Sequence, residues 1–328
     1  MTKDGSHIAD AHAVLLPAFA DPQLDEPLRQ FLRSGGRALL LGESRQEYVG
    51  RKMAPDRLAR ETPEMMRAFT REARQLSGSL IVAIDQEPTG IQRLQGFVQT
   101  MSSTDIQSAA ATVAKVAQSL GINFFLAPIL DVVTGHTTWL ANRTLGDDAS
   151  EVARIGAAFI IGVQSAGVAA TAKHFPGYPD MAIDPAIGIA RQSGTMEALQ
   201  AGLGPFRSAI ASGVYAIMTG PAVVEAFDPV HSASTSPATM QFLRDRLAFD
   251  GVIVSDDLDA PSVMLGESLA ETAIRSLNAG ADLLLLASGP HLPSVVEAIV
   301  AAAAGGRMPA GRLSEAAGRV RALAERLG

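Results

Sequence analysis

Residues 251–257 read Gly-Val-Ile-Val-Ser-Asp-Asp, a short apolar run that ends in two adjacent carboxylates. Its apolar residues are consecutive and do not alternate with polar ones, which is typical of a strand buried on both faces. Similar runs recur along the chain, and each is followed by a longer segment with helical periodicity. The pattern predicts parallel strands separated by helices.

The predicted strands and helices alternate along the chain. We expect strands at Ala13–Leu16, Arg37–Leu41, Leu80–Ile84, Phe124–Ala127, Ala169–Lys173, Val214–Thr219, Gly251–Ser255 and Ala281–Leu286. We expect helices at Leu24–Ser34, Pro63–Leu76, Ile106–Leu120, Glu151–Ala166, Thr195–Ala211, Ser236–Leu247, Glu267–Asn278 and His291–Ala304. No linker or low-complexity tract divides them, so they favour an α/β fold in which residues 1–328 form a single (β/α)8 TIM barrel. A last helix at Leu313–Leu327 would close or cap it, and a doubly wound open sheet is the competing architecture.

Composition excludes several classes of function. The 328 residues include no cysteine, which rules out disulfides, a thiol nucleophile and cysteinyl metal sites. The net charge of −7 argues against a nucleic-acid partner. The apolar runs are far shorter than the roughly 20 residues of a membrane helix, and Met1–Gly5 lacks the charged-then-apolar order of a signal peptide. We therefore expect a cytoplasmic protein with no membrane and no nucleic-acid partner.

Charged residues follow the predicted strands at the point where each strand ends. They are Asp85 and Glu87, Asp131, Lys173 and His174, and Asp256 and Asp257. The loops after the strands of a TIM barrel gather at one face, where active sites lie. Such converging carboxylates could bind a divalent metal, or bind sugar hydroxyls and supply the nucleophile of a glycosidase. They could also cap the helices that follow, although capping does not explain Lys173 and His174.

Three motifs occur in register with these strands. They are Ala170-Thr171-Ala172-Lys173-His174-Phe175-Pro176-Gly177, Gly251-Val252-Ile253-Val254-Ser255-Asp256-Asp257-Leu258, and Ile84-Asp85-Gln86-Glu87 followed by Gln92-Arg93-Leu94. Together they resemble glycoside hydrolase family 3, and within it the single-domain β-N-acetylglucosaminidases of the NagZ type. The resemblance covers almost the whole chain.

The resemblance implies a retaining mechanism on a small-molecule glycoside. Asp256 matches the family nucleophile, which forms a covalent glycosyl-enzyme. The positions that hold the sugar hydroxyls match Asp85, Asp131, Arg143, Lys173 and His174. Because the resemblance assigns His174 to the sugar, we expect no metal and no cofactor. Trp139, the single tryptophan, is the best stacking platform for a ring.

The same comparison exposes departures from the family. This branch carries its general acid/base as an Asp-Ser-His triplet after the Lys-His-Phe-Pro-Gly run, and here the triplet reads Asp184-Pro185-Ala186. The Asp survives as Asp184, and the catalytic His is replaced by Ala186. Three further replacements fall in the same pocket: Pro88-Thr89-Gly90 for Gly-Gly-Arg, Tyr178 for a His, and Met218-Thr219-Gly220-Pro221 for Met-Thr-Ala-His. We count Asp184 as a catalytic candidate and Tyr178 as a substrate-binding one.

Three hypotheses follow. The first is a glycosidase with an atypical acid/base, whose leaving group needs no protonation or whose proton donor is Asp184, Asp180, Tyr178, Glu87 or His231. The second is a repurposed transferase, phosphorylase or hydrolase of specialised metabolism. The third is a non-catalytic sugar-binding barrel, which the retention of Asp256 disfavours because a binder gains nothing from a nucleophile.

Overall fold

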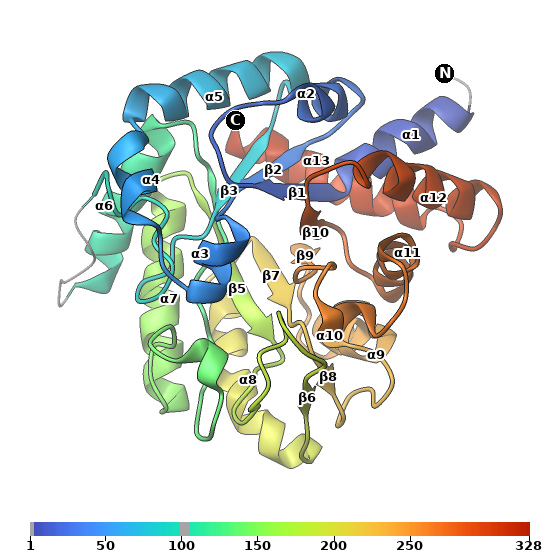
Figure 1. The fold of residues 1–328 in the computed structure, drawn as a ribbon. Coiled ribbons are helices and arrows are strands. Elements are labelled where there is room, and N and C mark those ends of the chain that lie inside the picture. Colours follow the sequence, from blue (N-terminus) through green and yellow to red (C-terminus); the bar gives the residue numbers. More distant parts are fainter. Residues whose placement is uncertain (1–2, 99–104) are drawn as a thin grey trace.

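The protein folds around a parallel sheet that closes on itself (Figure 1). The structure, a computed structural model, describes residues 3–98 and 105–328. The strands of the sheet are β1 (Leu15–Phe19), β2 (Ala38–Leu41), β3 (Ile81–Ile84), β4 (Phe124–Phe125), β5 (Ala169–Phe175), β7 (Ala216–Thr219), β9 (Val252–Val254) and β10 (Leu284–Ala287). Their order is β10-β1-β2-β3-β4-β5-β7-β9, and a parallel bridge between Val254 and Leu283 joins the two ends. The predicted α/β barrel is confirmed, and each of its eight strands overlaps an expected one.

Helices surround the sheet (Figure 1). The longer ones are α1 (Lys3–Ala13), α2 (Glu26–Arg33), α5 (Pro63–Ser77), α6 (Ile106–Ser119), α7 (Ala149–Ser165), α8 (Met196–Ala211), α11 (Leu269–Ala279), α12 (Leu292–Ala304) and α13 (Arg312–Leu327). The short ones are α3 (Arg45–Gly50), α4 (Pro55–Arg60), α9 (Pro237–Gln241) and α10 (Pro261–Met264), with single turns at Thr138–Leu140 and Ala233–Thr235. A small parallel ladder pairs β6 (Arg191–Gln192) with β8 (Val223–Val224).

Two details differ from the sequence-based expectation. The helix expected at Ser236–Leu247 is divided, because α9 passes into a π-helical turn at Phe242–Arg246. Helices α1, α3, α4 and α10 were not predicted. Three of these begin with recognisable signals, since Ser44 and Glu47 form a capping box at α3, Pro55 opens α4 and Pro261 opens α10.

One buried cluster fills the inside of the barrel. Alternate strand residues, such as Leu16, Ile81 and Phe124, form it together with Val320 and Leu323 of α13. The last helix therefore caps one end of the barrel. Leu126, Met218 and Leu285 belong to the same cluster and form the apolar floor of a cavity where the strands end. None of the described helices is long and apolar enough to cross a membrane.

Candidate active site

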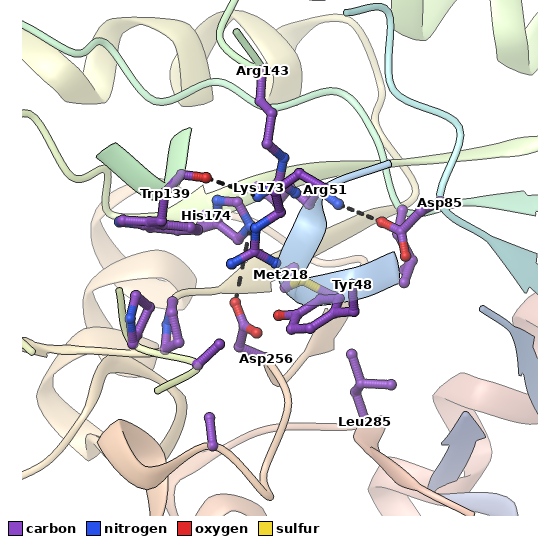
Figure 2. A pocket seen from close by; sticks show the side chains of 15 residues that line it. Tyr48, Arg51, Asp85, Trp139, Arg143, Lys173, His174, Met218, Asp256 and Leu285 are labelled. Carbon is purple, nitrogen blue, oxygen red and sulfur yellow. Dashed lines mark hydrogen bonds and ion pairs between the residues drawn. The ribbon is translucent and has the colours of Figure 1, made fainter. Parts of the chain in front are cut away.

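A cavity lies where the carboxyl ends of the strands meet (Figure 2). Five of the residues singled out in the sequence line it: Asp85, Arg143, Lys173, His174 and Asp256. Trp139 also lines it, and its ring centroid is 4.9 Å from that of His174. The remaining wall is formed by Tyr48, Arg51, Pro185, Ala186, Pro221 and Ala260. Three strands far apart in the sequence, β3, β5 and β9, thus bring their terminal charges to one site.

A buried ion network holds Lys173 in place. Its Nζ lies 2.7 Å from Oδ1 of Asp85 and 3.0 Å from Oε1 of Glu87. Glu87 also accepts hydrogen bonds from Arg143, at 2.6 Å from Nη2 and 3.1 Å from Nε. The Glu87 side chain has no exposed surface, and those of Lys173 and Arg143 are 3% and 5% exposed. Glu87 is therefore the central anion between two cations.

Burial and charge act in opposite directions on this network. Burial alone would raise the pKa of Glu87, but the charges of Arg143 and Lys173 hold that pKa well below its ordinary value. Burial alone would lower the pKa of Lys173, but Asp85 and Glu87 hold it above its ordinary value. All three groups are consequently charged at neutral pH. Glu87 has no proton to donate there.

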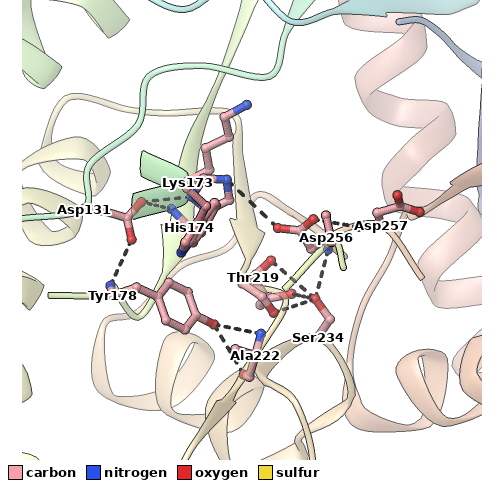
Figure 3. A network of polar contacts seen from close by, with 12 residues as sticks. Asp131, Lys173, His174, Tyr178, Thr219, Ala222, Ser234, Asp256 and Asp257 are labelled. Carbon is pink, nitrogen blue, oxygen red and sulfur yellow. Dashed lines mark hydrogen bonds and ion pairs between the residues drawn. The ribbon is translucent and has the colours of Figure 1, made fainter. Parts of the chain in front are cut away.

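Asp131 orients His174 (Figure 3). Oδ2 of Asp131 lies 2.9 Å from Nδ1 of His174 and accepts a hydrogen bond from the backbone N–H of the same residue at 3.0 Å. Since an ionised carboxylate only accepts hydrogen bonds, Nδ1 carries the proton and Nε2 faces the other way. Nε2 lies 4.0 Å from Oδ2 of Asp256. Asp131 itself does not line the cavity, so it is a positioning residue.

Substituting Asp131 tests this role. In Asp131→Asn we expect kcat/KM for the glycosides that the family resemblance implies to fall on the order of 10²-fold, because the His174 ring is no longer held in position. Asp228→Asn is the matched control, since Oδ2 of Asp228 lies 2.9 Å from Nδ1 of His231 outside the cavity. Equal losses in the two variants would contradict a specific role for Asp131.

Hydrogen bonds with Ser234 and Asp257 hold Asp256 in place. Its backbone N–H donates to Oγ of Ser234 at 2.9 Å, and its Oδ1 accepts from the backbone N–H of Asp257 at 2.7 Å (Figure 3). Oδ2 faces His174 across the cavity. The side chain is 8% exposed, which leaves the carboxylate reachable only through the cavity. The geometry suits a carboxylate that attacks a ring carbon held by Lys173 and His174.

Tyr178 does not line this cavity. Its side chain is fully buried, and its Oη lies 3.4 Å from both the backbone N and O of Ala222. A Cβ atom on Gly220 would lie only 2.1 Å from that Oη, so the tyrosine requires a glycine there. Tyr178 and Gly220, which both replace other residues of the family that the chain resembles, thus pack against each other. A substrate-binding role for Tyr178 finds no geometric support.

Gly90 is tied to the ion network in the same way. A Cβ atom at this position would lie 2.0 Å from Oε2 of Glu87 and 2.7 Å from Cγ of Arg143. A larger side chain at position 90 would displace the Glu87–Arg143 pair. An arginine at position 90 would therefore not fit beside Arg143 as Arg143 is packed here.

Asp184 is the first residue of a short segment that lines the cavity. Pro185 and Ala186 line the wall, while the Asp184 carboxylate lies 3.0 and 3.2 Å from Nη2 of Arg51. Oδ1 of Asp184 also accepts from the backbone N–H of Ala186 at 2.9 Å. The other proton-donor candidates, Asp180, Tyr178, Glu87 and His231, are not among the described residues that line the cavity.

The cavity is narrow, and a second one adjoins it. The side chains leave about 30 Å³ free at the centre, which is room for one or two water molecules. The Arg51–Asp184 ion pair joins the end of α3 to the segment that carries Pro185 and Ala186. The second cavity, of about 320 Å³, shares Tyr48, Asp85 and Leu285 with the first and is also lined by Glu43. Burial, and then the nearby Asp85 charge, raise the pKa of Glu43 well above its ordinary value.

Sequence reasoning missed Glu43 and Arg51. Glu43 follows a predicted strand almost directly, so the rule that found Asp85 also applies to it. Arg51 carries no such signal, because it lies in a loop and its partner is 133 positions away. No group of three or more His, Asp or Glu side chains suited to a metal ion occurs within residues 3–98 and 105–328.

Comparisons with known proteins identify the family of the chain. The model of the glycosyl hydrolase family 3 N terminal domain matches residues 49–323, and the chain belongs to this family. The beta-hexosaminidase of Methylococcus capsulatus is 30% identical over 254 residues, covering 73% of this chain and 76% of that protein.

Solved structures give the same result. A family 3 beta-N-acetylglucosaminidase from Paenibacillus sp. has a TM-score of 0.86 and 27% identity, covering 98% of this chain and 62% of that one. The beta-N-acetylhexosaminidase from Beutenbergia cavernae has a TM-score of 0.82 and 25% identity, covering 97% and 98% of the two chains. This protein is thus a beta-hexosaminidase-like member of the family.

Proposed function

We propose that this protein is a retaining, β-N-acetylglucosaminidase-like glycosidase for a glycoside whose leaving group needs little protonation. Asp256 is the nucleophile, and Asp85, Arg143, Lys173 and His174 bind the sugar. Residues 1–328 form one catalytic domain. The observation that carries the proposal is that the Asp256 carboxylate faces the Lys173–His174 pair in one cavity, while Ala186 stands on its wall.

The proposed reaction has two steps. In the first, Oδ2 of Asp256 forms a bond to the anomeric carbon, and the bond from that carbon to the leaving oxygen breaks with its electron pair going to the oxygen. In the second, water attacks the same carbon, releases the Asp256 carboxylate and gives up a proton to solvent. Lys173 and the His174 imidazole hold the ring hydroxyls throughout.

The first step lacks a conventional proton donor. By resemblance the donor is a histidine at position 186, where this chain has alanine, and Asp184 is engaged by Arg51. A missing general acid costs about 10²–10⁴-fold in rate for a leaving group that must be protonated. A phenol, carboxylate or phosphate leaves without a proton, and for these groups the cost is small.

A series of leaving groups tests the proposal. We expect kcat/KM to rise steeply from methyl through phenyl and nitrophenyl to dinitrophenyl β-N-acetylglucosaminides. The rise over this series should be at least about 10²-fold larger than the rise shown by an enzyme that protonates its leaving group. Parallel series with other sugars identify the preferred glycone. Turnover of the methyl glycoside within about tenfold of the dinitrophenyl glycoside would contradict the proposal.

Reintroducing an imidazole provides a second test. Ala186 is 3% exposed and lines the cavity, so Ala186→His places a ring beside the bound substrate. We expect the turnover of unactivated glycosides to rise about 10²-fold and that of dinitrophenyl glycosides to change little. Ile187→His is the control, since Ile187 is 66% exposed and does not line the cavity. A similar gain in both variants would exclude a specific effect at position 186.

A further inference from the structure

Arg51 lines the cavity from the C-terminal end of helix α3. It ends helix α3 with a positive φ of 53°, and its guanidinium lies over the Tyr48 ring at 4.5 Å from the centroid. The side chain is 15% exposed and lines the same cavity as Asp256 and Lys173. A residue outside the family-like motifs therefore contributes a positive charge to the site.

The donors of Arg51 are incompletely used. A guanidinium has five N–H groups, and Asp184 accepts hydrogen bonds from Nη2 alone. Nε and Nη1 are buried and have no hydrogen-bond partner among the described residues. Of the three cations that line the cavity, Arg51, Arg143 and Lys173, only Arg51 is in this situation within the described part of the chain. Buried charged donors without acceptors are costly, which points to an acceptor brought by a ligand.

The place of Arg51 indicates which part of the ligand it meets. Its partner Asp184 begins the segment whose Pro185 and Ala186 line the cavity. By resemblance this segment carries the proton donor, so the oxygen of the leaving group lies beside it. The guanidinium of arginine fits oxyanions such as carboxylate and phosphate.

We propose that Arg51 binds an oxyanionic leaving group, and that the natural substrate is a glycosyl ester of a carboxylic or phosphoric acid. This inference rests on the proposed function. When the bond to the anomeric carbon breaks, its electron pair goes to the ester oxygen, which departs as an oxyanion beside Arg51. At the same time Asp256 loses its charge by forming the glycosyl ester, so the departing oxyanion does not face a second anion there. Arg51 thus replaces protonation by charge neutralisation.

Binding without turnover tests the inference separately from the glycosidase activity. Inorganic phosphate and benzoate are titrated in turn by calorimetry into the 328-residue chain in chloride buffer, both as wild type and as Asp256→Asn, whose side chain is neutral like the ester. We expect at least one anion to bind, and Arg51→Met to weaken that binding by about tenfold to a hundredfold. Arg154→Met, which removes a 64% exposed surface cation, is expected to bind like its parent.

Asp184→Asn distinguishes anion binding from a purely structural role of Arg51. It weakens the hold on Nη2, so it is expected to bind the anion at least as tightly as its parent. Binding of phosphate alone or of benzoate alone identifies the ester class, and binding of both supports the shared oxyanion chemistry. The inference is overturned if neither anion binds, if Arg51→Met binds normally, or if Asp184→Asn loses binding as Arg51→Met does. If Arg51→Met is unfolded by circular dichroism, Arg51→Gln replaces it.

Discussion

Asp256→Asn should lower kcat/KM for dinitrophenyl glycosides on the order of 10⁴-fold or more. An amide has nearly the shape of the carboxylate and can still accept the hydrogen bond from the backbone N–H of Asp257, so the fold is expected to persist. It lacks the negative charge that attacks the anomeric carbon. Asp257→Asn is the matched control, because it removes the same charge one residue further along and is expected to cost at most about tenfold.

An external nucleophile makes this prediction more specific. In Asp256→Ala, added azide can take the place of the carboxylate, so activity should return in part as azide concentration rises. The product of a β-glycoside would then be the α-glycosyl azide, since a single displacement inverts the anomeric carbon. Turnover in Asp256→Asn above a tenth of wild type would show that another group supplies the nucleophile.

Glu87→Gln should have the largest effect on stability. The substitution leaves Arg143 without its carboxylate partner and Lys173 with only Asp85, in surroundings where both cations are buried. Breaking a buried ion pair from one side costs about 3–5 kcal/mol, so we expect the free energy of unfolding to fall by that amount at neutral pH. Glu151→Gln removes an exposed partner of Arg154 and is expected to leave the stability nearly unchanged, because solvent screens that pair. Urea unfolding of the two variants measures the difference.

The same substitution should alter the acid sensitivity of the fold. The pKa of Glu87 in the folded protein lies below its ordinary value of 4.5, so its pairing contributes full stability above pH 4.5. That contribution is lost as the pH falls below 4.5 towards the lower folded-state pKa. The difference between wild type and Glu87→Gln should therefore shrink in acid. A difference that grows in acid would contradict the charges assigned to this network.

The sequence predicted the barrel well because buried parallel strands leave a strong signal. Most strands of the sheet are short runs of consecutive apolar residues, as at Ile81–Ile84 and Val252–Val254. Helix α1 leaves a weaker one, since its eleven residues include several polar ones and a glycine. Packing against α12 and α13, and the ion pair between Asp10 and Arg321, supply the stabilisation that local sequence does not show.

The sequence also predicted which charges meet. Asp85, Lys173, His174 and Asp256 lie at or just after the carboxyl ends of parallel strands, and these ends meet at one face of the barrel. What it could not predict depends on three-dimensional packing. The burial of Glu87 between two cations, the fit of Tyr178 against Gly220 and the reach of Arg51 to Asp184 each join segments separated by many residues. No local pattern encodes such contacts.

Trapping the covalent intermediate tests the role of Asp256 most directly. A glycosyl fluoride with a second fluorine at carbon 2 or carbon 5 suits this site, because fluoride leaves without a proton and the second fluorine slows hydrolysis of the intermediate. After incubation and proteolysis, mass spectrometry should find one glycosyl group on the peptide that contains Asp256, and none in Asp256→Asn. An adduct on Asp184 or Glu43, or no adduct with any sugar tried, would contradict the assignment of Asp256 as the nucleophile.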